Sequence, residues 1–431
     1  MKKNSRLTER TPETKVLRDP IHGYIRIEYQ ILWDLINSAE FQRLRSIHQL
    51  GGVSLVYHNA EHTRFAHSLG VYELTRRMIE EVRSISSILS EEQQVEVMIA
   101  ALLHDIGHGP FSHFYESISL ISHETLGMEI ISSGKTEIHQ ILSRADSQLP
   151  KTVVSILQKR SDPPLLSSMI SSQLDADRMD YLLRDAYETG TTYGDFDLER
   201  VIRTLRASPD SIYIKKSGIH SVEDYIMARY QMYFQVYRHP DSYGYELLIE
   251  RFFKRAEYAE QKALQSGEQI PMPYQIFFEE CRRLKNPKRM LAEGKIELLD
   301  EAYLSSMIRQ ALLLDDPVLC DLARRILRRR LFVWIDQPDE KVLEEIRARL
   351  SKLGMDEEYY LNVLEECDSE YLPYHESSEP ILVEENDGSR KLLSQSSQLA
   401  DALLRVRNEP VRRIYFPREA LLPDSAGNET E

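Results

Sequence analysis

Residues 101–113 read ALLHDIGHGPFSH, and this stretch decides the fold. An apolar run ends in the adjacent pair His104 and Asp105, and His108 and His113 follow shortly after it. Two side chains that can carry charge are costly at the end of an apolar segment unless they have partners. Imidazole nitrogen and carboxylate oxygen are ligands that Zn, Mn, Fe or Mg accept. The pair therefore predicts half of a metal site.

The spacing of apolar residues before the pair predicts a helix. Val95, Ile99, Leu102 and Ile106 fall at i, i+4, i+7 and i+11, which is one face of an α-helix. Gly107 is expected to end this helix at its C-terminal cap. Further helices are expected at about residues 30–48, 64–83, 122–133, 173–188, 196–206, 221–238 and 243–266.

Both ends of the chain depart from this helical pattern. VLRDPIHGYIRI (16–27) predicts two short strands around a turn. After about residue 270 we expect charged helices (295–302, 317–329 and 340–353), a hairpin around Asn386-Asp387-Gly388 and a strand in VRRIYFPRE (411–419). The expected fold is mainly α. It comprises a flexible N-terminus (1–15), a helical core with a short β-hairpin (16–270), a smaller mixed α/β C-terminal part with a role in assembly (271–422) and a disordered tail (423–431).

Composition excludes several classes of protein. The 431 residues carry a formal charge of −15, whereas a protein that binds duplex nucleic acid normally presents a basic stripe. There is no run of about 18 apolar residues and no apolar segment after the first basic residues, so neither a membrane span nor a secretory signal is expected. Three cysteines (Cys281, Cys320 and Cys367) suit a reducing compartment, and we expect a cytoplasmic protein.

Two further residues complete the predicted metal site. His67 lies early in an expected helix, and Asp177 lies in QLDADRMDYLLRD. With His104 and Asp105 they would supply two imidazoles and two carboxylates, and would leave positions for water and a phosphoryl oxygen. A single histidine near an apolar face is more often hydrogen-bonded than metal-bound, but a cluster favours the metal. His62 and Asp175 are the alternatives to His67 and Asp177.

Five motifs in this order carry a family resemblance: FQRLRSIHQLGG (41–52), HTRFAHSLGV (62–71), HDIGHGPFSH (104–113), DADRMDYLLRD (175–185) and ARYQMYFQVYRHP (228–240). Together with RDPIHG (18–23) they resemble the HD-domain deoxynucleoside triphosphate triphosphohydrolases, which include bacterial dGTPase-like enzymes and the catalytic core of SAM-and-HD-domain proteins. The resemblance spans about residues 16–245. It implies an HD-domain helical core and a metal held by His67, His104, Asp105 and Asp177, in preference to the two alternatives.

The resemblance also implies the catalytic groups. His108, His113 and His123 would lie beside the α-phosphate, with Asp105 as the fourth catalytic residue. Histidine suits proton transfer at neutral pH because its pKa lies close to it. We expect His113 to contact phosphate and position it in line, and His108 and His123 to handle protons. Without the motif, His113 and His123 would be interpreted as residues that cap or bridge helices.

A larger set is implied to bind substrate. Arg64, Arg178 and Arg229 would contact the triphosphate, Tyr181 and Asp185 the 3′-hydroxyl, Gln49 the sugar and base, Leu50 and Tyr237 the two sides of C2′, and Tyr233 the region of the base. A clash between a 2′-hydroxyl and Tyr237 would exclude ribonucleotides. Tyr233 and Arg238 replace a histidine and a glutamine of some relatives, which leaves base preference open. For Arg178, a plain salt bridge to a neighbouring aspartate is the alternative.

Members of this family assemble as tetramers and respond to nucleotides bound between subunits. The matching positions are Lys15, Val16, Asn37, Gln42 and Arg45, with Arg200 from a neighbour. Asn37 replaces an aspartate of guanine-reading relatives, so a strict guanine effector is not expected. Helix surface is an equal interpretation of Arg45.

The sequence therefore predicts a metal-dependent dNTP triphosphohydrolase that cleaves at the α-phosphorus. It would use one divalent metal per active site (Mn, Fe, Zn, Mg or Co), with a further Mg on the triphosphate, and would form a homotetramer activated by a nucleotide. The alternatives are an HD-type phosphodiesterase or nucleotidase, and a non-catalytic scaffold that senses nucleotides. Bulk charge opposes an RNA-binding role.

Overall fold

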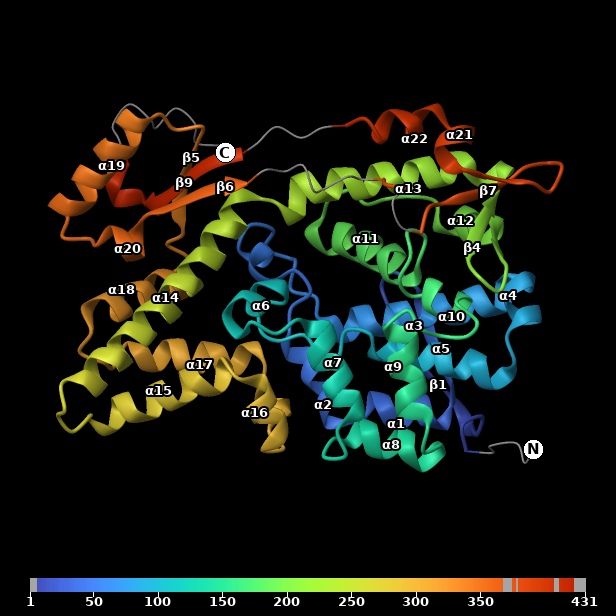
Figure 1. Cartoon of the computed structure of the whole chain (residues 1–431), viewed down its shortest axis with the longest axis horizontal. Helices are drawn as coiled ribbons and strands as arrows, with labels where there is room; N and C mark the ends of the chain where they lie inside the picture. The colour runs from blue at the N-terminus through green and yellow to red at the C-terminus, as the bar shows by residue number, and fades with distance from the viewer. Residues whose placement is uncertain (1–5, 367–373, 377–378, 407–410, 422–431) are drawn as a thin grey trace. The chain divides into compact units, whose positions relative to one another are not determined.

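The computed structural model describes residues 6–366, 374–376, 379–406 and 411–421, which form two compact units (Figure 1). Unit 1 comprises Met1–Val236, Pro287–Glu301 and Leu372–Val406, and unit 2 comprises Tyr237–Asn286, Ala302–Tyr371 and Arg407–Glu431. These units divide the chain differently from the predicted single boundary near residue 270. The predicted tail (423–431) and Cys367 lie outside the described residues.

The N-terminal hairpin consists of β1 (Arg10–Asp19) and β2 (Gly23–Tyr29), which pair antiparallel. The prediction of a flexible segment up to residue 15 is wrong from Arg10 onward. Arg10 forms an ion pair with Glu28 and lies over the ring of Tyr29, 4.0 Å from its centroid. These contacts hold the first residues of β1 against β2, although their sequence is polar.

Unit 1 is mainly helical, and three of its helices carry the predicted metal ligands: α3 packs against both α5 and α11. Its helices are α1 (Gln30–Ile36), α2 (Ala39–Gln42), α3 (Arg64–Glu81), α4 (Arg83–Ile88), α5 (Glu91–Leu103), α6 (His113–Ser119), α7 (His123–Ser132), α8 (Glu137–Ala145), α9 (Leu149–Leu157), α10 (Leu165–Ser168), α11 (Ala176–Thr189), α12 (Leu198–Thr204), α13 (Ile219–Met232), α16 (Pro287–Ala292), α21 (Leu393–Ser396) and α22 (Gln398–Leu403). Shorter 3-10 turns cover Arg43–Ser46, Gly51–Leu55, Lys216–Gly218 and Ile296–Leu298.

The predicted core face of α5 is confirmed, because Val95, Ile99 and Leu102 are fully buried. Ser90 begins the helix with a capping box that it forms with Gln93. The predicted role of Gly107 as a C-terminal cap is wrong, since α5 ends at Leu103. A Cβ at Gly107 would lie 2.0 Å from the carbonyl oxygen of His123, so this glycine allows α7 to approach the turn after α5.

A four-stranded sheet joins distant parts of unit 1. Its order is β3 (Leu205–Ala207), β4 (Ile212–Lys215), β7 (Leu382–Glu384) and β8 (Arg390–Leu392), with β4 and β7 parallel. β7 and β8 form the predicted hairpin, and Gly388 takes a φ of 81° in its turn. This pairing explains why residues 374–406 belong to unit 1 and not to a separate C-terminal domain.

Unit 2 is mixed α/β. It contains α14 (Pro240–Gln265), α15 (Met272–Leu284), α18 (Pro317–Leu327), α19 (Glu340–Lys352) and α20 (Glu357–Tyr360), and most of α17 (Glu301–Ala311). Its antiparallel sheet has the order β5 (Phe332–Asp336), β9 (Val411–Pro417), β6 (Asn362–Glu366), which confirms the predicted strand in VRRIYFPRE. The helix predicted at 295–302 is wrong, because a 3-10 turn and then the first two residues of α17 occupy it.

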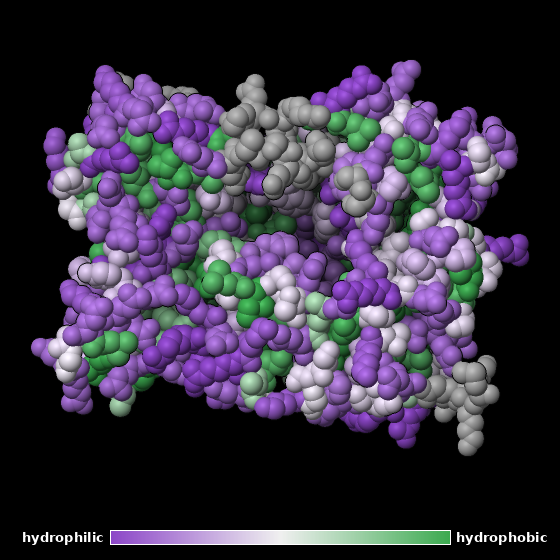
Figure 2. Space-filling view, viewed as in Figure 1, coloured by the Kyte–Doolittle hydropathy of each residue, from purple (hydrophilic) through white to green (hydrophobic). Residues whose placement is uncertain are grey.

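Figure 2 shows one face of the molecule, on which hydrophilic residues predominate and hydrophobic ones occur in small groups. Scattered surface hydrophobic residues of this kind are normal for a folded protein. Among the described residues, no helix combines the length and the apolar character needed to cross a bilayer.

Candidate active site

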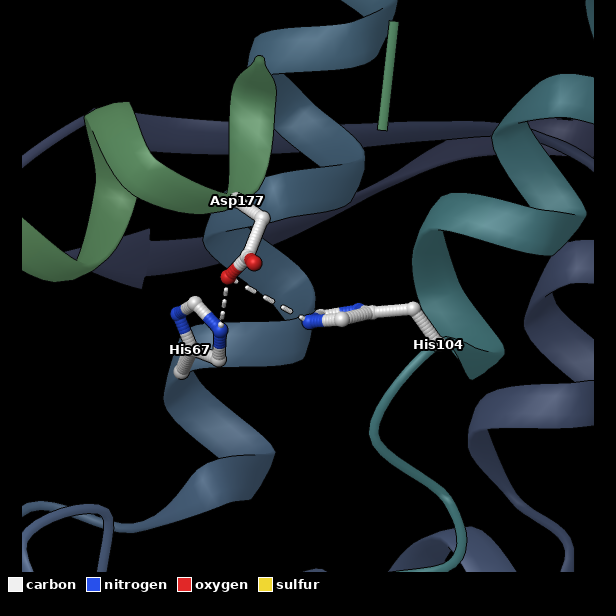
Figure 3. Close-up of side chains that lie close together, drawn as sticks. All are labelled: His67, His104 and Asp177. Carbon is white, nitrogen blue, oxygen red and sulfur yellow. Dashed lines mark ion pairs between the residues drawn. The ribbon is translucent and has the colours of Figure 1, made fainter. Parts of the chain in front are cut away.

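Three helices of unit 1 bring His67, His104 and Asp177 together (Figure 3). His67 comes from the first turn of α3, His104 is the C-cap of α5, and Asp177 lies in the first turn of α11. Asp177 Oδ1 lies 3.1 Å from His67 Nε2 and 3.6 Å from His104 Nε2. The three donor atoms therefore converge on one point.

Both imidazoles are oriented for metal binding by hydrogen bonds from their other ring nitrogen. His67 Nδ1 donates to Asp180 Oδ2 at 2.8 Å, and His104 Nδ1 donates to the carbonyl of Ala101 at 2.8 Å. Each Nε2 is then left as the lone-pair donor. His104 Nε2 is buried and has no hydrogen-bond partner. An orphaned lone pair that faces two carboxylates is the environment a divalent cation fits.

Asp105 completes the donor set. Its Oδ1 lies 3.4 Å from His104 Nε2, and its Oδ2 lies 3.7 Å from His67 Nε2. Burial alone would raise the pKa of Asp105, but His104 and Arg64 outweigh it and hold the pKa well below its usual value. The structure thus brings all four predicted ligands together, and their role as ligands stays a prediction.

Electrostatics favour positive charge at this point. Burial opposes protonation of His67, yet hydrogen bonds to Asp177 and Asp180 raise its pKa to about 10. The pKa of Asp177 is lowered, because the nearby imidazoles of His104 and His67 outweigh its burial. A cluster that holds a proton this strongly would stabilise a divalent cation at neutral pH for the same reason.

The two alternative ligands have other roles. His62 Nε2 lies 2.7 Å from Asp185 Oδ1, and both side chains are buried. Asp175 caps α11, accepting from the backbone N–H of Arg178 at 2.7 Å, and also forms an ion pair with the Arg178 guanidinium. Arg178 therefore makes the plain salt bridge that was the alternative to its predicted contact with phosphate.

A buried network behind His67 was missed from the sequence. Asp180 accepts from His67, lies 2.6 Å from His22 Nε2, and pairs with Arg184 at 2.9 Å. Arg184 also donates to Asp19 at 2.8 Å. The RDPIHG motif thus contributes Asp19 and His22 to this network. The signal was available: Asp180 and Arg184 are four residues apart, one helical turn.

A second group lies next to the metal ligands. The ring of His108 stacks on that of His123, with centroids 3.9 Å apart and planes 14° apart, and His113 meets both edge-on at 5.1 Å. His108 Nε2 lies 3.3 Å from Asp105 Oδ1, so one carboxylate touches both groups. Burial and the nearby Arg64 guanidinium hold the pKa of His108 well below its usual value, so this imidazole is neutral.

Glu116 joins the other two histidines of this group. Its Oε1 accepts from His113 Nδ1 at 3.2 Å and from His123 Nδ1. Burial would raise the pKa of Glu116, but these hydrogen bonds lower it to about 2. Glu116 was missed, although it lies three residues after His113 on the same helix face.

The loop before His113 has an unusual backbone. Phe111 and Ser112 take φ values of 59° and 54°, which are costly for residues other than glycine. Glu301 Oε1 accepts from the N–H of Phe111 at 3.2 Å and from that of His48 at 2.9 Å. Its other oxygen bonds the His48 ring, and this hydrogen bond raises the pKa of His48 to about 9. Glu301 is 190 residues from Phe111, so no local pattern could have found it.

Arg64 and Gln49 lie beside this loop. Arg64 pairs with Asp105, and its Nε donates to Ser112 Oγ at 2.9 Å. It also contacts the carbonyl of Gln49, whose own Oε1 is buried without a partner. Arg64 thus touches a metal-ligand carboxylate, a contact that its predicted role at the triphosphate did not include.

The sugar and base positions divide between two elements. α11 carries Tyr181, whose ring lies 6.5 Å from that of His67, and the buried Asp185. The predicted α-helix over 221–238 ends at Met232, and Tyr233–Tyr237 form a π-helix. Arg229 lies in the last turn of α13, and the π-helix after it changes the positions of Tyr233 and Tyr237 from those on a continuous α-helix. Tyr237 opens unit 2, whereas the half-buried Leu50 belongs to unit 1.

The predicted effector residues already make contacts within the chain. Asn37 donates to the carbonyl of Trp33 at 2.7 Å, Gln42 accepts from Arg45 at 2.8 Å, and Arg200 donates to the carbonyl of Ser217 at 2.9 Å. Lys15 and Val16 lie on β1, where Val16 is 51% exposed. Their role in binding an effector stays a prediction.

Two family models match the part of the chain that carries this site. Residues 64–185 match the HD domain and residues 196–262 match the HD-associated region. The chain belongs to the HD-domain family of dNTP triphosphohydrolase-like proteins and is a metal-dependent phosphohydrolase. It is similar to the uncharacterized protein YwfO of Bacillus subtilis, with 38% identity over 95% of this chain and 93% of that protein.

Several relatives are named for an activity. The deoxynucleoside triphosphate triphosphohydrolase SAMHD1 homolog of Dictyostelium discoideum is 31% identical over 57% of this chain and 50% of its own length. For SAMHD1 of Gallus gallus the values are 29%, 56% and 45%, so the chain spans about half of each. A crystal structure of a phosphohydrolase from Bacteroides thetaiotaomicron matches with a TM-score of 0.80 and 29% identity, over 94% of this chain and 100% of that one.

Proposed function

We propose that this protein hydrolyses deoxynucleoside triphosphates at the α-phosphorus and releases deoxynucleoside and inorganic triphosphate. One observation carries the proposal: Asp105 Oδ1 lies 3.4 Å from His104 Nε2 and 3.3 Å from His108 Nε2. The same carboxylate thus links a metal-ligand set to a group of histidines suited to proton transfer. Hydrolysis of a phosphate ester needs both.

The chain's own groups divide the work. A divalent cation held by His67, His104, Asp105 and Asp177 would supply an activated water and polarise the α-phosphoryl oxygen. His113 contacts the phosphate that is attacked. The proton released from water must finally reach the 5′-oxygen, as the bond from phosphorus to that oxygen breaks. His123 is favoured over the neutral His108 as its donor, because Glu116 accepts from His123 Nδ1 and would stabilise the charged ring.

Recognition of the substrate follows from the remaining predicted residues. Arg178 and Arg229 bind the triphosphate, Tyr181 and Asp185 the sugar, and Gln49 and Tyr233 the base. Exclusion of ribonucleotides by a side chain against C2′, the role expected of Leu50, is part of the same proposal. Activation by a nucleotide, a homotetramer and a cytoplasmic location are parts of the same proposal and rest on the family resemblance of the sequence motifs. The dNTP substrate is supported by the relatives named for dNTP triphosphohydrolase activity.

The test is product identification by mass spectrometry for each dNTP in ¹⁸O water, with Mn, Mg, Fe or Co and with or without a second nucleotide. We expect unlabelled deoxynucleoside and triphosphate that carries one ¹⁸O. Pyrophosphate with dNMP, or stepwise release of phosphate, would reject the proposal. Turnover of cyclic nucleotides or monophosphates alone would favour a phosphodiesterase or nucleotidase, and dNTP binding without any product would favour a sensing scaffold.

A further inference from the structure

A cavity of about 640 Å³ opens on the surface of unit 1, away from the groups described above. Four arginines line it, and they come from three elements: Arg83 begins α4, Arg200 and Arg203 lie one turn apart on α12, and Arg206 lies on β3. Of these, only Arg200 belongs to the predicted effector set. In a chain with a formal charge of −15, such a local excess of arginine calls for an explanation.

None of the four guanidinium groups meets a carboxylate among the described residues. Arg200 donates to the carbonyl of Ser217 at 2.9 Å, and Arg206 to that of Arg203 at 3.3 Å. Arg83 and Arg203 have no side-chain hydrogen bond or ion pair in the described part of the chain. Each guanidinium carries five N–H donors, so most of these donors face solvent.

The acidic residues of the cavity wall do not neutralise these arginines. Glu81 and Glu199 both pair with Arg77, each at 2.8 Å. Asp197 accepts from the backbone N–H of Arg200 at 2.9 Å and so caps α12. The three carboxylates are thus directed to other partners, and none of them forms an ion pair with the four arginines in the described part of the chain.

The wall is built by a specific contact between two elements. Ser84 Oγ accepts from the backbone N–H of Ala207 at 2.9 Å, which fixes the start of α4 against β3. This bond holds Arg83 and Arg206 on the same cavity. The spacing of the arginines is therefore set by how these backbone elements pack and not by the conformations of individual side chains.

We infer that this cavity binds an oligophosphate chain, either inorganic triphosphate or the triphosphate of a nucleotide. Guanidinium forks match phosphate oxygens in geometry and charge. A single phosphate could engage only part of a four-arginine wall, whereas a chain of phosphates can bridge it. The volume lies within the range of small-ligand sites. The inference does not depend on the proposed reaction, since binding is measured without turnover.

The experiment is phenylglyoxal labelling of arginines, resolved by peptide mass spectrometry, on the full chain without divalent metal. Inorganic triphosphate, a dNTP, and phosphate or sulfate at matched ionic strength are the probes. We expect triphosphate to protect Arg83 and Arg203 but not Arg160, an exposed arginine outside the cavity. Protection by the dNTP alone would identify a nucleotide as the ligand and support the inference. Equal protection by sulfate, or of Arg160, would overturn it.

A substitution within the cavity tests whether its arginines form one binding site. In Arg203→Ala, half-protection of Arg83 should need about tenfold more triphosphate, the effect of losing one charge-assisted contact. In the matched variant Arg160→Ala the protection of Arg83 should not change. Because the readout is Arg83 itself, triphosphate bound at the metal site does not contribute. An unchanged protection curve in Arg203→Ala would contradict a shared site.

Discussion

The two histidine groups of unit 1 are held in different ways. His67 lies buried on α3 and His104 is the C-cap of α5, and their rings are oriented by Asp180 and by the carbonyl of Ala101. His113 follows two residues with positive φ, and its side chain is 73% exposed. The first arrangement gives the fixed geometry that a cation needs. The second leaves one end of the site accessible to a ligand, and its position depends on Glu116 and Glu301.

The largest effect is expected from removing a buried metal ligand. His104→Ala should lower metal affinity by more than about 100-fold, above the range known for residues that only support a ligand. Metal content after dialysis and the rate of dNTP hydrolysis measure it. His220→Ala, an exposed histidine on α13, is the control and should match the native protein. Native metal content in His104→Ala would contradict the assignment of the site.

The next effect tests the support behind His67. Asp180→Asn keeps the shape of the side chain but weakens its hold on His67 Nδ1. We expect metal affinity to fall about 10–100-fold, measured by competition with a chelator. Asp34→Asn, in which an exposed carboxylate on α1 is changed, should have no effect. If both variants bound metal equally well, Asp180 would have only a structural role.

Glu116→Gln should affect the histidine group of His113 and His123 without affecting the metal ligands. Its loss should slow hydrolysis about 10–100-fold, within the range for general acid–base catalysis, and leave metal content unchanged. Because the pKa of Glu116 is about 2, the native carboxylate is ionised throughout the working pH range, so the deficit should persist at every pH tested. Glu124→Gln, which changes the exposed neighbour of His123, is the control. A parallel loss of metal would show that the groups are not independent.

The smallest expected effect is on stability and depends on pH. The pKa of His48 is raised to about 9 in the folded protein, from an ordinary 6.5. Its pairing with Glu301 therefore stabilises fully below about pH 6.5 and is lost as pH rises through 9. The contribution is on the order of 2 kcal/mol. Urea unfolding at pH 6.5 and 9.5 measures it.

Two variants isolate this contribution. Glu301→Gln should remove most of the pH dependence of the unfolding free energy. Glu61→Gln, at the exposed partner 2.7 Å from His48 Nε2, should remove less, because solvent screens that pair. The same pH dependence in Glu301→Gln as in the native protein would show that Glu301 does not hold His48 charged.

Local patterns predicted the helices of the core and the candidate ligands. Apolar spacing predicted α5, and the motifs place His67 on α3, His104 and Asp105 directly after α5, and Asp177 on α11. What the sequence did not reveal depends on contacts over long separations. Glu301 acts on Phe111 from 190 residues away, and the approach of α7 to Gly107 is a packing requirement. The π-helix at Tyr233 is likewise invisible to a 3.6-residue period.

The compact units differ from the predicted domain boundary for the same reason. A change in charge and helix pattern near residue 270 suggested a separate part, but compactness depends on which segments pack together. β7 pairs with β4, although the two strands are far apart in the sequence, so no local pattern could reveal the pairing. The order of motifs predicted the site, and only the three-dimensional contacts define the unit that holds it.

The buried guanidinium of Arg43 has a consequence for any shortened form of this protein. It donates to the carbonyls of Ile106 and His108, on either side of Gly107, and also to the carbonyl of Leu299 at 2.8 Å. A fragment cut at residue 270 would keep every matched motif and yet lose Leu299 and Glu301. The residues that support the candidate site thus come from distant parts of the chain, and such a fragment would lack the contacts that Leu299 and Glu301 make with Arg43 and Phe111.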